Sequence, residues 1–99
     1  GGATVSAPTR VATADALARL DSAWAAEGEV ALRRRFVFED FSAAFAFMTR
    51  AALEAERLGH HPEWTHNYGV VDVRLTTHDA GGVTTLDIAL ASALDRFAQ

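Results

Sequence analysis

Three of the four histidines in this 99-residue chain fall at fixed positions of one stretch, residues 56–87, that also carries carboxylates. His60 and His61 are adjacent and precede the rigid Pro62, and His78 follows farther along. Imidazole titrates near pH 6.5, so histidine can give and accept protons at cellular pH. Converging histidines, one of them oriented by a carboxylate, form a general acid–base set, in which each proton transfer typically contributes about 10²–10⁴-fold. Because no serine, cysteine or lysine is evidently placed as a nucleophile, we expect proton transfer without a covalent intermediate.

The acidic residues of this stretch have a structural interpretation beside the chemical one. Glu56 falls in the last turn of an expected helix, where the helix dipole disfavours negative charge, yet it can be a solvated helix residue. Asp87 follows Thr84 at the spacing of a capping box, so it can serve to fix a helix start and the loop that carries His78. His60 alone can be a polar residue that ends a helix.

The aromatic residues and the fourth histidine are less specific. Trp64 and Tyr68 can be core or interface aromatics as readily as walls against which a ligand stacks. His66 lies outside the pattern formed by the other histidines, and we interpret it as exposed polar surface.

A zinc site is the main alternative to acid–base chemistry. His60, His61, His78 and Glu56 are residue types that bind zinc. The chain has no cysteine, and it lacks both the helical His-x3-His spacing and the His-Glu-x-x-His motif. We therefore predict that the protein binds no metal.

Composition narrows the class of protein. Hydrophobic residues make up 49% and charged residues 22%, as in ordinary globular domains, and no apolar run approaches the roughly 20 residues that span a membrane. The net charge of -4 argues against nucleic acid as the main partner, because phosphate backbones are bound by basic surfaces. The start of the chain lacks a charged-then-apolar signal pattern, so we expect a cytoplasmic protein.

The first third of the chain predicts a flexible start, a short helix and a hairpin. Residues 1–10 are small, polar and aperiodic, and we expect residues 11–99 to form one domain. Thr13 can cap a helix whose buried stripe continues through Leu17 and Leu20 to Trp24.

The next segment alternates with period two. This alternation over residues 29–39 predicts a strand with Arg33 and Arg35 on its solvent face, preceded by a hairpin arm at residues 24–27. Arg34 breaks the pattern.

The longest predicted helix runs from Asp40, which can cap it, to Leu58, where Gly59 ends it. Two apolar stripes follow its length. Because a helix that is apolar on more than one side is usually covered on more than one side, we expect a second subunit there. The first stripe contains Phe41, Phe45, Met48, Ala52 and Ala55, and the second contains Phe47, Ala51 and Leu58.

Two strands and a helix complete the chain. Residues 64–68 can extend, residues 71–75 alternate cleanly, and a last helix carries Leu86, Leu90 and Phe97 on one face. Strands joined in hairpins form antiparallel sheets, and helices must bury their stripes on a sheet face. The predicted fold is α+β in two layers, with three helices packed on one face of a four-stranded antiparallel sheet.

Taken as a whole, the spacing Glu-x3-His-His-Pro-x5-Tyr-x9-His-x8-Asp, from Glu56 to Asp87, resembles the signature of the pterin-4a-carbinolamine dehydratases. The resemblance extends from about Trp24 to Phe97. It implies a hydro-lyase that removes water from a 4a-hydroxytetrahydropterin and gives the quinonoid dihydropterin, in the recycling of tetrahydrobiopterin for the aromatic amino-acid hydroxylases. It implies no metal and no organic cofactor.

By the same resemblance, His60, His61 and His78 are the catalytic histidines. Glu56 and Asp87 match the flanking acidic positions, Trp64 a site-lining aromatic residue and Pro62 a positioning residue, which makes these four the expected substrate-binding residues.

The resemblance also bears on partners. Family members form dimers or tetramers, which agrees with the expected role of the 40–58 helix. Some animal members act as dimerisation cofactors of a homeodomain transcription factor, which is the alternative function. Nothing in the sequence supports that partner directly.

Overall fold

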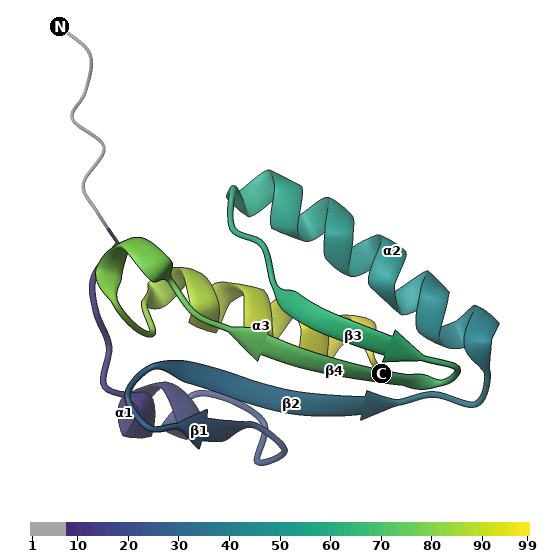
Figure 1. Cartoon of the computed structure of the whole chain (residues 1–99), viewed down its shortest axis with the longest axis horizontal. Coiled ribbons are helices and arrows are strands. Elements are labelled where there is room, and N and C mark those ends of the chain that lie inside the picture. The colour runs from purple at the N-terminus through teal and green to yellow at the C-terminus, as the bar shows by residue number, and fades with distance from the viewer. Residues whose placement is uncertain (1–7) are drawn as a thin grey trace, which may run out of the picture.

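The computed structural model describes residues 8–99, and its elements follow the predicted order of helix, two strands, helix, two strands, helix. Figure 1 shows a single sheet with the helices against it. The predicted α+β fold with a four-stranded antiparallel sheet and three helices is confirmed. The elements are α1 (Thr13–Ala18), β1 (Ala25–Glu27), β2 (Ala31–Val37), α2 (Phe41–Leu58), β3 (Glu63–Asn67), β4 (Val70–Leu75), the 3₁₀ helix η1 (His78–Ala80) and α3 (Thr85–Phe97).

The sheet places the two strands of strongest alternation at its centre. Its order is β1-β2-β4-β3, and every neighbouring pair is antiparallel. Leu32 of β2 lies opposite Leu75 of β4, and Phe36 lies opposite Val71; all four side chains are buried on the face that the helices cover. The other face carries the polar half of each alternation.

The β3–β4 hairpin has a two-residue turn at Tyr68 and Gly69. Tyr68 adopts a left-handed conformation with φ 53°. A Cβ on Gly69 would lie 2.5 Å from the carbonyl oxygen of Phe38, so only glycine fits this close approach. The turn sets the register that pairs Glu63 with Arg74 at the far end of the hairpin.

Arg34 faces the helices because the salt bridge it forms there compensates for its charge. Its guanidinium lies 2.6 Å from Asp95 of α3 and 4.4 Å from the ring centre of Phe36. The indole nitrogen of Trp24 donates to the same carboxylate at 2.8 Å. A half-buried charge is thus neutralised and hydrogen-bonded, and the broken alternation of β2 is explained.

The prediction for the first helix is partly wrong. α1 ends at Ala18, and Trp24 is buried from the segment after the helix, so it does not extend a helical stripe. Thr13 is the first helical residue and does not cap α1; the carboxylate of Glu29 instead accepts from the Thr13 amide at 3.1 Å and from the Thr13 hydroxyl at 2.7 Å.

The ends of α2 are as predicted. The Asp40 side chain accepts from the Ala43 amide at 2.8 Å, and Gly59 takes the left-handed conformation at φ 65°.

The two faces of α2 differ from the prediction. Phe47 and Ala51 are fully buried in this protomer, where Phe47 packs against Phe36 and Phe38 of the sheet. The exposed large apolar side chains of α2 are Phe41, Phe45 and Leu53, which are 52%, 54% and 68% accessible. Self-association through this helix stays a prediction and would use these exposed side chains, whereas a charge at Phe47 would disrupt the core.

Seven residues of the predicted flexible segment, 1–7, lie outside the described part, and the boundary between residues 10 and 11 stays a prediction. Arg10 already pairs with Thr84 in an isolated bridge. Within residues 8–99, no helix has the length and apolar character needed to cross a membrane.

Candidate active site

Two chain segments bring the three predicted catalytic histidines to one hollow of about 280 Å³. His60 and His61 follow the end of α2, where the turn at Gly59 lets the His60 amide donate to the Ala55 carbonyl at 3.0 Å. His78 begins η1, directly beyond β4. The residues that line the hollow are Gly59, His60, His61, Thr76, Thr77, His78 and Asp79.

His60 is the buried member of the set. Its side chain is about 10% exposed, and its Nε2 atom lies 2.5 Å from Oδ1 of Asp87, which is fully buried. An ionised carboxylate has no hydrogen to donate, so Nε2 carries the proton in this contact. The Nδ1 atom is then the nitrogen left for a substrate or water.

Asp87 is held by more than His60. Its Oδ2 atom accepts from the Thr84 backbone amide at 2.9 Å and from the Thr77 hydroxyl at 2.8 Å. The capping box predicted at the start of α3 is present. One carboxylate thus caps α3, fixes the strand end at Thr77 and contacts His60. The structural interpretation of Asp87 is confirmed, and its chemical role stays a prediction.

His61 and Glu56 form an exposed pair. Their closest atoms, Nε2 and Oε1, are 2.5 Å apart, while the side chains are 62% and 76% accessible. Glu56 belongs to the last turn of α2, and His61 lies two residues beyond its end. Glu56 at this unfavourable helix position is therefore compensated by an imidazole that can carry positive charge.

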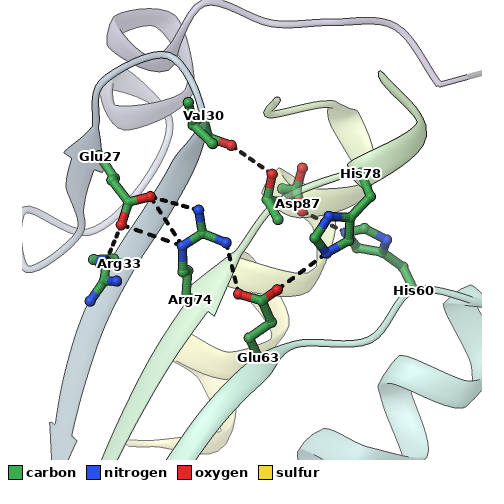
Figure 2. A network of polar contacts seen from close by, with 9 residues as sticks. Glu27, Val30, Arg33, His60, Glu63, Arg74, His78 and Asp87 are labelled. Carbon is green, nitrogen blue, oxygen red and sulfur yellow. Dashed lines mark hydrogen bonds and ion pairs between the residues drawn. The ribbon is translucent and has the colours of Figure 1, made fainter. Parts of the chain in front are cut away.

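His78 is paired as well, with Glu63 of β3. Its Nε2 atom lies 3.2 Å from Oε1 of Glu63, whose other oxygen accepts from Arg74 at 2.7 Å. Arg74 chiefly, through its hydrogen bond and its charge, lowers the pKa of the Glu63 carboxyl, and His78 lowers it to a lesser extent. Arg74 is also bonded to Glu27 at 2.6 Å, and Figure 2 shows the row that these side chains form across the sheet to His78.

Each of the three histidines therefore has a carboxylate at its Nε2 atom, and each presents the remainder of its ring near one hollow. A carboxylate that is hydrogen-bonded to one ring nitrogen holds an imidazole in one orientation. The arrangement can donate one proton to a bound molecule and accept another.

The family model described as pterin 4 alpha carbinolamine dehydratase matches residues 7–97. The chain belongs to the pterin carbinolamine dehydratase family. It is 57% identical over 82 residues, 83% of this chain and 84% of the relative, to a protein of Chelativorans sp. (strain BNC1) assigned by its name to the pterin-4-alpha-carbinolamine dehydratases.

A second relative and a solved structure extend the comparison. A protein of Rhodopseudomonas palustris (strain HaA2), assigned by name to the same dehydratases, is 60% identical over 72 residues, which is 73% of this chain and 71% of the relative. The crystal structure of a transcriptional coactivator/pterin dehydratase from Brucella Melitensis superposes with a TM-score of 0.83 at 49% identity, covering 88% of this chain and 93% of that one.

Five residues of the dehydratase pattern lie outside the lining of the hollow. Glu56 and Asp87 contact the rings of His61 and His60, and their predicted contact with a substrate stays a prediction. The other three are Pro62, Trp64 and Tyr68. Pro62 links His61 to β3 and is half-buried. Trp64 is half-buried against the core. Tyr68 is 65% exposed in the hairpin turn, which Figure 1 shows at the opposite end of β4 from η1. Contact of Pro62 and Trp64 with a substrate stays a prediction.

The interpretation of His66 as exposed surface needs correction. The side chain is half-buried on the helix-covered side of β3, with its ring centre 4.8 Å from that of Phe41. Its Nε2 atom hydrogen-bonds the Tyr68 carbonyl at 2.6 Å. His66 does not line the hollow.

Within residues 8–99, no group of three histidine, cysteine, aspartate or glutamate side chains converges in a way that could hold a metal ion. Each histidine of the hollow is paired at Nε2 with a different carboxylate. Metal independence itself stays a prediction for the activity.

Sequence reasoning missed Thr77 and Glu63. The sequence did contain a signal for Glu63. Counting residue pairs outward from a two-residue turn at Tyr68 and Gly69 places Glu63 opposite Arg74, which has the opposite charge. Thr77 gave no comparable signal, since its role depends on the approach of Asp87 from α3.

Proposed function

We propose that the protein dehydrates a 4a-hydroxytetrahydropterin to the quinonoid dihydropterin, as part of the recycling of the reduced cofactor used by aromatic amino-acid hydroxylases. The observation that carries this proposal is the convergence of three carboxylate-paired imidazoles on one hollow in a chain of the dehydratase family. His60, His61 and His78 are the proposed catalytic residues.

The reaction requires two proton transfers and no redox step. A protonated imidazole gives its proton to the 4a-hydroxyl group, the bond between C4a and that oxygen breaks, and water departs. A neutral imidazole removes the proton from N5, and the electrons of the broken N5–H bond form the C4a–N5 double bond. The enzyme ends with the same number of protons as at the start, because one ring loses a proton and another gains one.

The carboxylates have the supporting role in this proposal. Asp87 holds His60 in a buried contact, whereas Glu56 holds His61 at the surface. The two environments differ in burial, and pairs of titratable groups in different environments are suited to divide acid and base roles.

The test is dehydration kinetics, with the 4a-hydroxytetrahydropterin supplied by a coupled hydroxylase, on the wild type and on His60→Ala, His61→Ala and His78→Ala. Each change should lower kcat, and double changes should cost less than the product of the single effects, because residues that act as a unit are non-additive.

His66→Ala is the matched control, since His66 lies on β3 outside the hollow. If His66→Ala is as damaging as the others, or if the losses only follow lost stability, the site assignment is wrong.

A second function, binding of a protein partner, is supported by one structural observation. Phe41 and Phe45 stack on each other with ring centres 5.9 Å apart and are about half exposed on α2. The similar protein from Brucella Melitensis is described as a coactivator as well as a dehydratase. We propose that this aromatic pair on α2 mediates self-association, and that a partner's helix would compete for the same surface.

Sedimentation distinguishes self-association at this surface from the binding of a partner's helix. A homo-oligomer that dissociates when Phe45 is made charged supports self-association. A native protein that is monomeric at micromolar concentration, yet co-purifies with an amphipathic helix through Phe45, supports partner binding instead.

A further inference from the structure

A row of alternating charges runs across the open face of the sheet and ends at His78 (Figure 2). Glu27 of β1 accepts from Arg33 at 2.6 Å and from Arg74 at 2.6 Å. Arg74 of β4 also donates to Glu63 of β3, which in turn holds His78 of η1. The row thus connects every strand of the sheet to one histidine of the hollow.

His78 needs such a support because packing does not provide one. Its side chain is 77% exposed, whereas that of His60 is 10% exposed and enclosed by the fold. An exposed side chain samples several rotamers and loses that freedom only when a specific contact holds it. Among the described residues, Glu63 supplies the hydrogen bond recorded for the His78 ring.

Glu63 can hold the ring only if its own carboxylate is fixed. Arg74 fixes it by donating from Nη1 to Glu63, while Nε and Nη2 of the same guanidinium donate to Glu27. A planar guanidinium bonded on two sides has one orientation available, which a lysine at this position could not reproduce. Arg74 is also the half-buried member of the row, at 23% exposure.

The charges in the row agree with this geometry. Hydrogen bonds from Arg74, and then from Arg33, hold the pKa of the Glu27 carboxyl at about 2. Arg74 likewise lowers the pKa of the Glu63 carboxyl, and the two glutamates raise the pKa of Arg74. Glu27, Glu63 and Arg74 therefore stay ionised, and the contacts among these three side chains stay charge-assisted, throughout the neutral and mildly acidic range.

We propose that Glu63 and Arg74 are positioning residues for His78: Arg74, anchored on Glu27, fixes the Glu63 carboxylate, and Glu63 holds the imidazole toward the hollow. The catalytic part of this proposal rests on the proposed dehydratase function. Neither Glu63 nor Arg74 lines the hollow, so both act on the reaction through His78.

The experiment compares Glu63→Ala, Arg74→Gln and the double variant with Arg35→Gln as the control. Arg35 is a suitable control because it lies on the same face in β2 and donates two hydrogen bonds to Asp72, at 2.8 and 3.2 Å, without reaching Glu63 or His78. Each protein is measured for kcat and KM and for the rotamer order of the His78 ring by carbon NMR relaxation.

The expected result is a loss of ring order at His78 in Glu63→Ala and Arg74→Gln, with little change in Arg35→Gln. The value of kcat should fall by about 10-fold or more, since small displacements of a catalytic group can cost up to about 10²-fold, and KM should change less than kcat. The double variant should be no slower than Glu63→Ala, because Arg74 acts through Glu63. Arg74→Lys should restore only part of the loss.

Any of three results would overturn the proposal. One is an unchanged His78 ring order in Glu63→Ala, another is a double variant whose loss equals the product of the single losses, and the third concerns activity. The NMR measurement needs no substrate, so it decides the positioning of His78 even if the wild type proves inactive. Loss of activity in His78→Ala with full activity in Glu63→Ala would refute this inference alone and leave the dehydratase proposal standing.

Discussion

Asp87 offers the sharpest test of the site, because one carboxylate supports the fold and the chemistry through different oxygens. Oδ2 accepts from Thr84 and Thr77, while Oδ1 contacts His60. Asp87→Asn can keep its amide oxygen in the Oδ2 position and so preserve the cap of α3. Its amide nitrogen then faces Nε2 of His60 as a donor, which forces the imidazole to carry its proton on Nδ1.

The expected cost in stability is small for this change and large for Asp87→Ala. Replacing a charge-assisted hydrogen bond by a neutral one costs about 1 kcal/mol, which corresponds to a melting temperature lower by about 4–8 °C in a domain of this size. Asp87→Ala removes the cap partner and strands the His60 ring, which together cost about 2–4 kcal/mol. The Thr77 hydroxyl is not stranded, because it lies 2.7 Å from the hydroxyl of Thr84.

Asp87→Asn should lose much of the activity although it loses little stability. In Asp87→Asn the Nδ1 atom of His60 carries a hydrogen and no free lone pair, so His60 can no longer accept a proton at that atom. The loss in kcat should lie within the range of one general acid–base group, about 10²–10⁴-fold. The assays are a thermal melt and dehydration kinetics on the same preparations.

Asp95→Asn is the matched control, since Asp95 is a carboxylate of the same helix with partners, Trp24 and Arg34, outside the hollow. It should lower stability and leave kcat within about two-fold. The reasoning is refuted if Asp87→Asn keeps wild-type activity, or if Asp95→Asn loses as much activity as Asp87→Asn at equal loss of stability.

Three further predictions concern metal, association and acid. Dehydration should survive exhaustive chelation, because each histidine is paired with a carboxylate; loss of activity restored only by zinc would contradict this. Phe45→Asp should reduce the sedimenting mass, because it charges the exposed aromatic pair on α2, whereas Ala14→Asp on α1 should not; equal masses would argue against this surface. The Glu27 carboxyl has a pKa of about 2 in the folded chain against an ordinary 4.5, so its contribution to stability is present above about pH 4.5 and is lost as the pH falls through 2. Glu27→Gln should therefore flatten the decline of unfolding free energy across this window, and a decline as steep as that of the wild type would show that Glu27 does not contribute.

The hydrophobic pattern was sufficient to predict the order and class of the elements. The period-two runs gave β2 and β4, and the capping residues Asp40 and Gly59 gave the two ends of α2, because these signals depend on neighbours a few residues away. The faces of α2 could not be assigned in the same way. Alanines on several sides make the stripes overlap, and only packing against Phe36 and Phe38 selects Phe47 as the buried residue.

The sequence alone was enough to name the three proposed catalytic histidines, and the tertiary structure decided which carboxylate is paired with each of them. The spacing from Glu56 to Asp87 was enough to single out His60, His61 and His78, since a family signature is carried by residue types at fixed separations. The partners of these rings lie 5, 15 and 27 residues away in the chain. The two longer separations are closed by the register of the β3–β4 hairpin and by the docking of α3, which are long-range events that no local pattern encodes.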